Sequence, residues 1–230
     1  MLEYNYKVCR IPKRKSLSIS ISANNIIEVR ANKSISEQEI KKFLYQKQRW
    51  IQKTLHFNQH VRKPYLFKNF IPGEKFLYLG KEYSLFFKNG KYPQVQLQAE
   101  KIVVNICKKI KDEKKYTQQL LTKWYKNKAS KLFKGKVLFF SKILNVKINS
   151  LTIKTFRRSW GNCSFSGNIR LNWRLVMCPV AVIDYVIVHE LCHLIHHNHS
   201  QLFWQKLKML IPEYKNLKAW LIINENMLQW

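Results

Sequence analysis

Acidic residues are scarce in this sequence. Its 230 residues include 13 Asp and Glu against 42 Lys and Arg, and the formal net charge is +29. The excess is smallest at the C-terminal end, where residues 151–230 hold 9 basic and 4 acidic side chains. Such a charge favours attraction for phosphate, nucleotide or nucleic acid, and one interpretation is weak nucleic-acid binding through a basic surface. The other is compositional bias, because Lys, Asn and Ile are all abundant.

Paired cysteines and long apolar runs are also lacking. The odd number of cysteines and the absence of any CxxC pair argue against a disulfide framework; they are Cys9, Cys107, Cys163, Cys178 and Cys192. The N-terminus has no apolar segment typical of a signal peptide, so we expect a cytoplasmic protein. Asp184 and His189 interrupt the longest apolar stretch, and no membrane span is expected.

The pattern of apolar residues predicts an α+β protein of two parts. Residues 1–107 read as a β-rich module with one helix, which opens at a capping box formed by Ser36 and Glu39 and runs to about Leu55. Residues 108–230 read as an α+β domain that begins with a charged connector and a long helix. A hairpin over residues 150–176, with its turn at residues 166–168, then leads to an apolar helix that Pro179 starts.

That apolar helix, expected from Val182 toward Trp204, carries the pattern HExxH in His189, Glu190 and His193. Residues four apart share a helix face, so the two imidazoles point toward one position. Unpaired polar side chains on a buried helix are costly, and a metal ion accounts for their presence. HExxH is typical of zinc hydrolases, in which a glutamate takes the proton of the attacking water. We therefore predict one Zn²⁺ ion, with Glu190 as general base.

A catalytic zinc ion usually takes three protein ligands, and three further histidines follow the motif: His196, His197 and His199. On a continuous helix, His196 would extend a straight row that spans about 10 Å from His189, which does not suit a tetrahedron. A helix that ends near His197, with Asn198 in a left-handed turn, would bring His199 in from another direction. Its offset of ten residues from His189 matches the third ligand of HExxHxxGxxH enzymes, so His199 is favoured.

Two C-terminal blocks resemble the YgjP-like metallohydrolases, relatives of the SprT-type zinc peptidases. They are residues 157–175 (RRSWGNCSFSGNIRLNWRL) and 179–204 (PVAVIDYVIVHELCHLIHHNHSQLFW), with looser similarity near the N-terminus in KRKSLSISISANNIIEVR and KQRWI. The resemblance implies that His189, His193 and His199 bind zinc and that Glu190 is catalytic. It also implies a zincin-like domain after an N-terminal β-rich module. The edge strand beside the metal would be residues 172–175.

The substrate stays open at this point, because fold and motif establish an activated water but not the bond it attacks. The resemblance implies a metallopeptidase, and a UTP pyrophosphatase activity has also been ascribed to this group. Peptide cleavage needs an edge strand free to pair with the substrate, whereas nucleotide cleavage needs arginines around phosphate oxygens. Candidate substrate-binding residues are Arg158, Asn172 and Arg174. A nucleic-acid-associated zinc protease is a further alternative.

Overall fold

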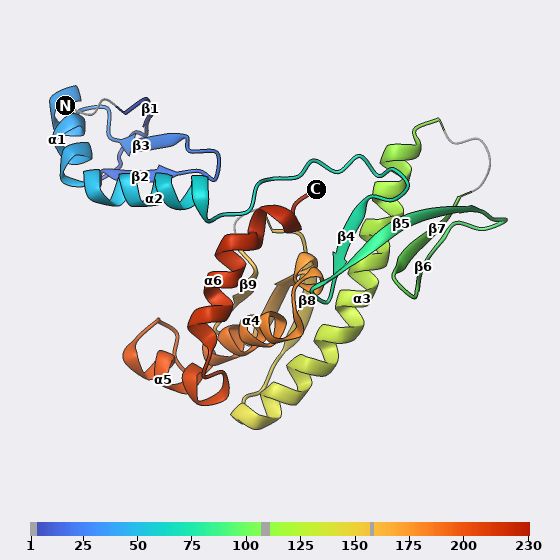
Figure 1. The fold of residues 1–230 in the computed structure, drawn as a ribbon. Helices are drawn as coiled ribbons and strands as arrows, with labels where there is room; N and C mark the ends of the chain where they lie inside the picture. The colour runs from blue at the N-terminus through green and yellow to red at the C-terminus, as the bar shows by residue number, and fades with distance from the viewer. Residues whose placement is uncertain (1–3, 107–110, 157–158) are drawn as a thin grey trace. The chain divides into compact units, whose positions relative to one another are not determined.

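The computed structural model describes residues 4–106, 111–156 and 159–230. Its backbone is mixed α+β, as expected, and forms two compact units (Figure 1). One unit comprises Met1–Tyr65 with Ile223–Met227, and the other comprises Leu66–Ile222 with Leu228–Trp230. Within the described ranges, no helix is both long and apolar enough to cross a membrane. The four cysteines that the structure describes are all free thiols.

The N-terminal unit packs a three-stranded sheet against two helices. Strand β3 (Ile27–Ala31) lies in the centre, parallel to β1 (Tyr6–Arg10) and antiparallel to β2 (Ser18–Ile21). The expected capping box of Ser36 and Glu39 is present at the start of α1 (Glu37–Gln46). The single helix expected here is interrupted at Lys47, and α2 (Gln48–His60) follows. The apolar core of this unit consists of Ile27, Val29, Ala31, Ile40, Leu44 and Ile51.

The larger unit begins with a four-stranded sheet in the order β4-β5-β7-β6. Its strands are β4 (Lys75–Tyr78), β5 (Lys81–Asn89), β6 (Gln94–Gln98) and β7 (Lys101–Ile106). The first two form a hairpin, with Gly80 at positive φ in its turn. The sheet shares one apolar core with the C-terminal helices, through residues such as Phe76 and Leu85. The compact units divide after Tyr65. The boundary that the sequence placed at residue 107 lies outside the described residues.

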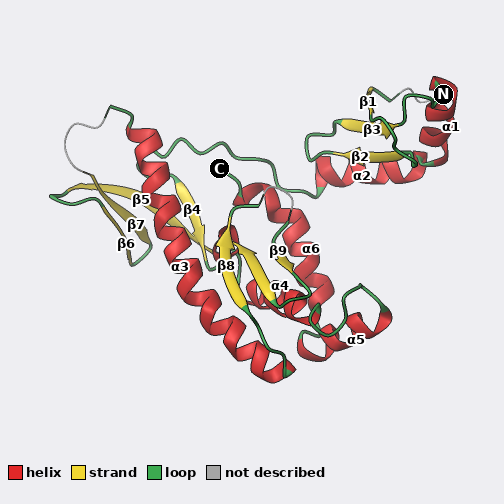
Figure 2. Cartoon of the chain, turned by 180° about the vertical axis from the view of Figure 1, so that it is seen from behind, coloured by secondary structure: helices red, strands yellow, loops and turns green. Residues whose placement is uncertain are grey.

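Helix α3 (Glu113–Leu144) connects the two sheets of the larger unit. It contacts β6 of the four-stranded sheet and β8 (Ser150–Lys154) of the second sheet, and both views show it running past them (Figures 1 and 2). Asp112 caps its first turn, and Asn145 ends it in the left-handed conformation that favours asparagine or glycine. The buried phenol of Tyr125 donates to the carbonyl of Leu77, which fixes the helix to β4.

The second sheet has the order β8-β10-β9 and lies against the motif helix. Strand β10 (Asn168–Asn172) is central, parallel to β8 and antiparallel to β9 (Gly161–Cys163). The chain continues through the 3-10 helix η1 (Trp173–Met177) into α4 (Val180–Cys192). The remaining elements are α5 (Gln201–Leu210), α6 (Tyr214–Asn224) and the 3-10 helix η2 (Glu225–Leu228).

The expectation that residues 172–175 form an edge strand is wrong. Asn172 ends the central strand and caps η1: its side-chain oxygen accepts a hydrogen bond from the amide of Arg174, the second residue of η1. All five residues of η1 are buried, because this turn packs between α3 and α4. Apolar and polar residues alternate along residues 169–175, a pattern typical of a strand, but tertiary packing buries both classes from Asn172 onward. The edge strand that contacts α4 is β9.

Candidate metal centre

Helix α4, which carries the motif, is apolar on nearly every side. Its buried residues include Val186, Ile187 and Val188, so the helix lies inside the larger unit and delivers His189 and Glu190 at its last turn. The helix ends at Cys192, earlier than the sequence suggested. The amide of His193 bonds to the carbonyl of Glu190 at 3.3 Å, a tighter turn that redirects the chain. Asn198 is not among the described residues with positive φ, so the expected left-handed turn is absent.

The loop after α4 returns His199 to the two helical histidines. Nε2 of His199 lies 3.2 Å from Nε2 of His189. One ring nitrogen from each of His189, His193 and His199 lies within 4.8 Å of the others. Two nitrogens bound at about 2.0–2.1 Å to one tetrahedral zinc ion are about 3.3 Å apart. The donor set therefore fits a metal ion of the zinc type, and the spacing of His189 and His199 matches the expected distance.

Aromatic side chains hold the three imidazoles in place. The buried ring of Phe203, on α5, lies 5.0, 4.7 and 4.8 Å from the rings of His189, His193 and His199, centroid to centroid. The indole of Trp204 stacks on His199 at 5.4 Å with an interplanar angle of 22°, and its Nε1 donates to the carbonyl of His199 at 3.1 Å. Tyr214 stacks on the same indole at 5.4 Å. The sequence motif pointed to the histidines but not to this support.

The remaining loop histidines have other roles. The carbonyl of His196 lies 3.3 Å from Nδ1 of His193, a contact that would leave Nε2 of His193 for a metal. Nδ1 of His197 lies 2.9 Å from the carbonyl of His193. Neither His196 nor His197 belongs to the group of converging nitrogens. The structure thus brings together the three histidines that the sequence favoured.

Burial tunes the charge of these groups. It lowers the pKa of His189 to about 3, with smaller contributions from His193, His199 and Lys218. Burial is also the main cause that lowers the pKa of His193. Both imidazoles are therefore neutral at pH 7, as metal ligation requires. Burial raises the pKa of the Glu190 carboxyl to about 7, which suits a group that exchanges a proton near neutral pH.

Strand β9 forms the wall opposite the histidines. A cavity of about 380 Å³ is lined by Gly161, Asn162, Cys163, Phe165, His189, Glu190, His193, His197 and His199. Gly161 lies so close to Glu190 that a Cβ atom there would be 2.6 Å from its Oε1. Burial and the charge of Glu190 raise the pKa of Cys163 to about 11, so this thiol stays protonated at neutral pH. No described strand pairs with the second edge of β9.

Two of the predicted substrate-binding residues contact other parts of the chain. The amide of Asn172 donates to the carbonyls of Phe156 and Ser159, at 3.1 and 3.2 Å. The guanidinium of Arg174 donates to the carbonyl of Trp230 at 3.0 Å and lies 4.6 Å from the ring of Trp173. Neither residue lines the cavity beside the histidines. Arg158 lies outside the described residues.

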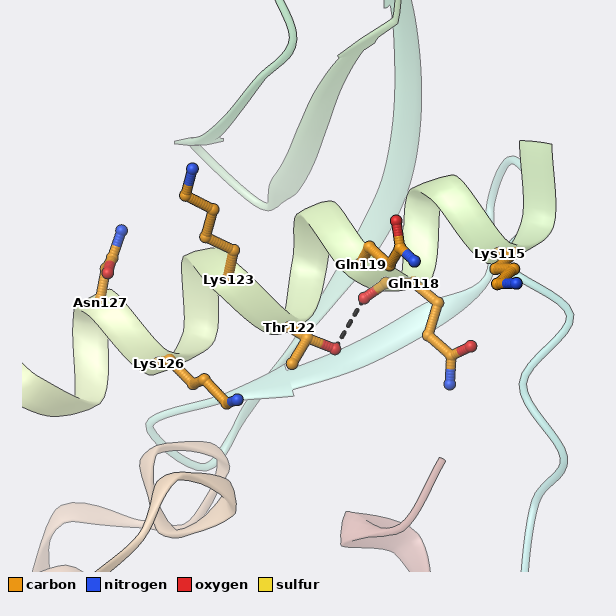
Figure 3. Close-up of a pocket in the computed structure, with 7 residues that line it drawn as sticks. All are labelled: Lys115, Gln118, Gln119, Thr122, Lys123, Lys126 and Asn127. Carbon is orange, nitrogen blue, oxygen red and sulfur yellow. Dashed lines mark hydrogen bonds between the residues drawn. The ribbon is translucent and has the colours of Figure 1, made fainter. Parts of the chain in front are cut away.

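A second hollow follows the exposed side of α3 and has a different character. Figure 3 shows its seven lining residues: Lys115, Gln118, Gln119, Thr122, Lys123, Lys126 and Asn127. The hydroxyl of Thr122 bonds to the carbonyl of Gln118 at 2.7 Å, as the dashed line marks. These side chains offer amides and ammonium groups but no carboxylate, thiol or imidazole. Weak nucleic-acid binding by the basic surface stays a prediction.

The end of helix α4 and the loop after it bring three histidines together beside a buried glutamate, an arrangement typical of metal-dependent hydrolases. Comparison with protein families agrees: the family described as "YgjP-like, metallopeptidase domain" matches residues 15–224, and the chain belongs to it. A comparison with curated proteins gives no match. One similar solved structure is described as the crystal structure of the metallopeptidase zymogen of Pyrococcus abyssi abylysin. It is 23% identical with a TM-score of 0.36, over 38% of this chain and 90% of that one.

Proposed function

We propose that this chain is a zinc-dependent peptidase of zincin-like architecture, in which His189, His193 and His199 hold one zinc ion. The observation that carries the proposal is the convergence of these imidazoles beside Glu190, on a cavity whose other wall is an edge strand. A zinc ion bound there supplies Lewis acidity, which lowers the pKa of a coordinated water to about 7. The family supports hydrolysis, and the edge strand favours a polypeptide as the substrate.

Glu190 is the general base in this proposal. Its carboxylate lines the cavity and is largely screened from solvent, and its pKa of about 7 lets it accept a proton at neutral pH. The same group can then donate that proton to the leaving amine, since an acid of this pKa works in both directions. Gly161 allows β9 to approach the carboxylate, which limits the positions that Glu190 can adopt.

A polypeptide would bind in extended conformation along β9. The unpaired edge of this strand offers backbone donors and acceptors, which suit a substrate chain of any sequence. Phosphate recognition would need cations in the cavity, and its described lining residues include no Lys or Arg. The described site therefore favours peptide over nucleoside triphosphate. Asn172 and Arg174 support the backbone around the site through the contacts given above.

Zinc-loaded protein should be incubated in parallel with an unfolded polypeptide and with UTP. We expect polypeptide cleavage that disappears in Glu190→Gln, with zinc stoichiometry unchanged at one ion per chain. Gln keeps the shape of the side chain but cannot accept the proton, so loss of turnover without loss of metal isolates its role. Turnover of UTP that Glu190→Gln abolishes, with the polypeptide left intact, would refute the peptidase proposal.

A further inference from the structure

The turn between β9 and β10 presents an exposed aromatic ring beside the metal cavity. Phe165 is 81% exposed, unusual for a phenylalanine in a tightly bonded turn. Its ring meets that of His197 at a centroid distance of 4.4 Å, edge to face. The same residue lines a neighbouring cavity, of about 560 Å³, which is distinct from the hollow on α3. Phe165 thus stands at the boundary between the histidine cavity and its neighbour.

Backbone hydrogen bonds fix the turn that carries this ring. The amide of Gly167 bonds to the carbonyl of Ser164 at 3.0 Å, and the amide of Asn168 bonds to the hydroxyl of Ser164 at 3.1 Å. The carbonyl of Gly167 accepts from the amide of Asn149 at 2.9 Å, which ties the turn to the preceding segment. Gly167 has a φ of +76°, and a Cβ there would be 3.2 Å from the carbonyl oxygen of Lys147. The turn therefore holds Phe165 outward in a defined position.

Both apolar and polar residues line this neighbouring cavity. Half-buried Val146, Ile148 and Leu194 line it, together with Phe165. Lys147 is the single ionisable side chain among its lining residues, so the cavity has little to hold an anion. The other lining residues are Asn145, Asn149, Ser166 and Gly167. This combination suits an apolar side chain whose backbone stays near water.

Strand β9 lines the histidine cavity, and the turn that follows it lines the neighbouring cavity. Gly161, Asn162 and Cys163 line the histidine cavity, and Phe165 comes two residues later. A substrate paired with the open edge of β9 would therefore lead from Glu190 toward Phe165. We propose that Phe165, Val146, Ile148 and Leu194 form a subsite for an apolar side chain of a polypeptide substrate, on the turn side of the cleaved bond. This inference rests on the peptidase function proposed above.

Cleavage-site mapping tests the subsite. Zinc-loaded protein should be incubated with a mixture of unfolded polypeptides, and the products identified by mass spectrometry. We expect Leu, Ile, Met or Phe to be enriched at one fixed position relative to the cleaved bond. Phe165→Ala and, from another segment that lines the cavity, Ile148→Asn should both remove that enrichment and retain zinc. Phe139→Ala is the matched control, because Phe139 is also an exposed phenylalanine but lies on α3.

Peptide binding to zinc-loaded Glu190→Gln gives a readout that needs no turnover. A peptide with Leu at the enriched position should bind Phe165→Ala/Glu190→Gln about tenfold more weakly than Glu190→Gln, because one apolar contact is lost. The same peptide with Ser there should bind both proteins equally. Equal weakening of both peptides, or unchanged enrichment in both subsite variants, would overturn the subsite while the peptidase function stands. Absence of any polypeptide cleavage by the zinc-loaded wild type would instead overturn the proposed function itself.

Discussion

Gly161 and Glu190 are in such close contact that no side chain fits between them. A Cβ atom at residue 161 would lie 2.6 Å from Oε1 of Glu190 and 2.8 Å from its Cδ. Glu190 is itself buried, so a methyl group at residue 161 would push the carboxylate away from its present position. The edge strand and the proposed general base therefore determine each other's position.

Gly161→Ala should reduce peptide hydrolysis by about 10²-fold, because a displacement of the base by about 1 Å can cost that much. The three atoms nearest to the added methyl group all belong to Glu190 and none to the converging histidines, so zinc stoichiometry should stay at one. Gly135→Ala is the control: a Cβ there meets nothing within 4 Å on the exposed side of α3. It should leave hydrolysis unchanged and stabilise the helix by about 1 kcal/mol. Full activity in Gly161→Ala would contradict this positioning of Glu190.

The zinc content of alanine variants should distinguish the role of His199 from that of His196. His199→Ala removes one nitrogen of the converging group, so the protein should lose stoichiometric zinc on dialysis against a mild chelator. His196→Ala should retain the metal, because His196 contributes its backbone carbonyl to Nδ1 of His193 and keeps that carbonyl in the variant. Metal content by elemental analysis measures both. Full zinc content in His199→Ala would contradict the third ligand.

The sequence predicted the three converging histidines better than the contacts around them. The helical spacing predicted that His189 and His193 converge, and the need for a third ligand from another direction predicted His199. Both arguments depend on only a few consecutive residues. Gly161 and Trp204 could not be found in this way, because their role arises from contacts between separate elements. The polar alternation in residues 170–174 was misleading for the same reason. Burial of Arg174 depends on Trp230, which is distant in sequence.

The metal-free protein should become less stable than its Glu190→Gln variant as the pH rises. Burial raises the pKa of Glu190 from 4.5 to about 7 in the folded state. The favourable contribution of the neutral carboxyl is fully present below about pH 4.5 and is lost as the pH rises through 7, because the unfolded chain then ionises more readily. Chemical denaturation at pH 8 should show Glu190→Gln more stable by up to about 3 kcal/mol, with no difference at pH 4. An equal difference at both pH values would contradict burial as the cause.

Trp204 should control metal affinity through His199. Trp204→Phe keeps an aromatic ring against His199 but loses the Nε1 donor to its carbonyl, whereas Trp204→Ala loses both contacts. We expect zinc affinity, measured by competition with a chromogenic chelator, to fall in steps from wild type to Phe to Ala, with a loss of about 10- to 100-fold for Ala. Tyr214→Phe is the control, since its ring can keep the stack on the indole. Circular dichroism should be used to check that each variant folds. Equal zinc affinity in folded Trp204→Ala and wild type would show that His199 binds the metal without this support.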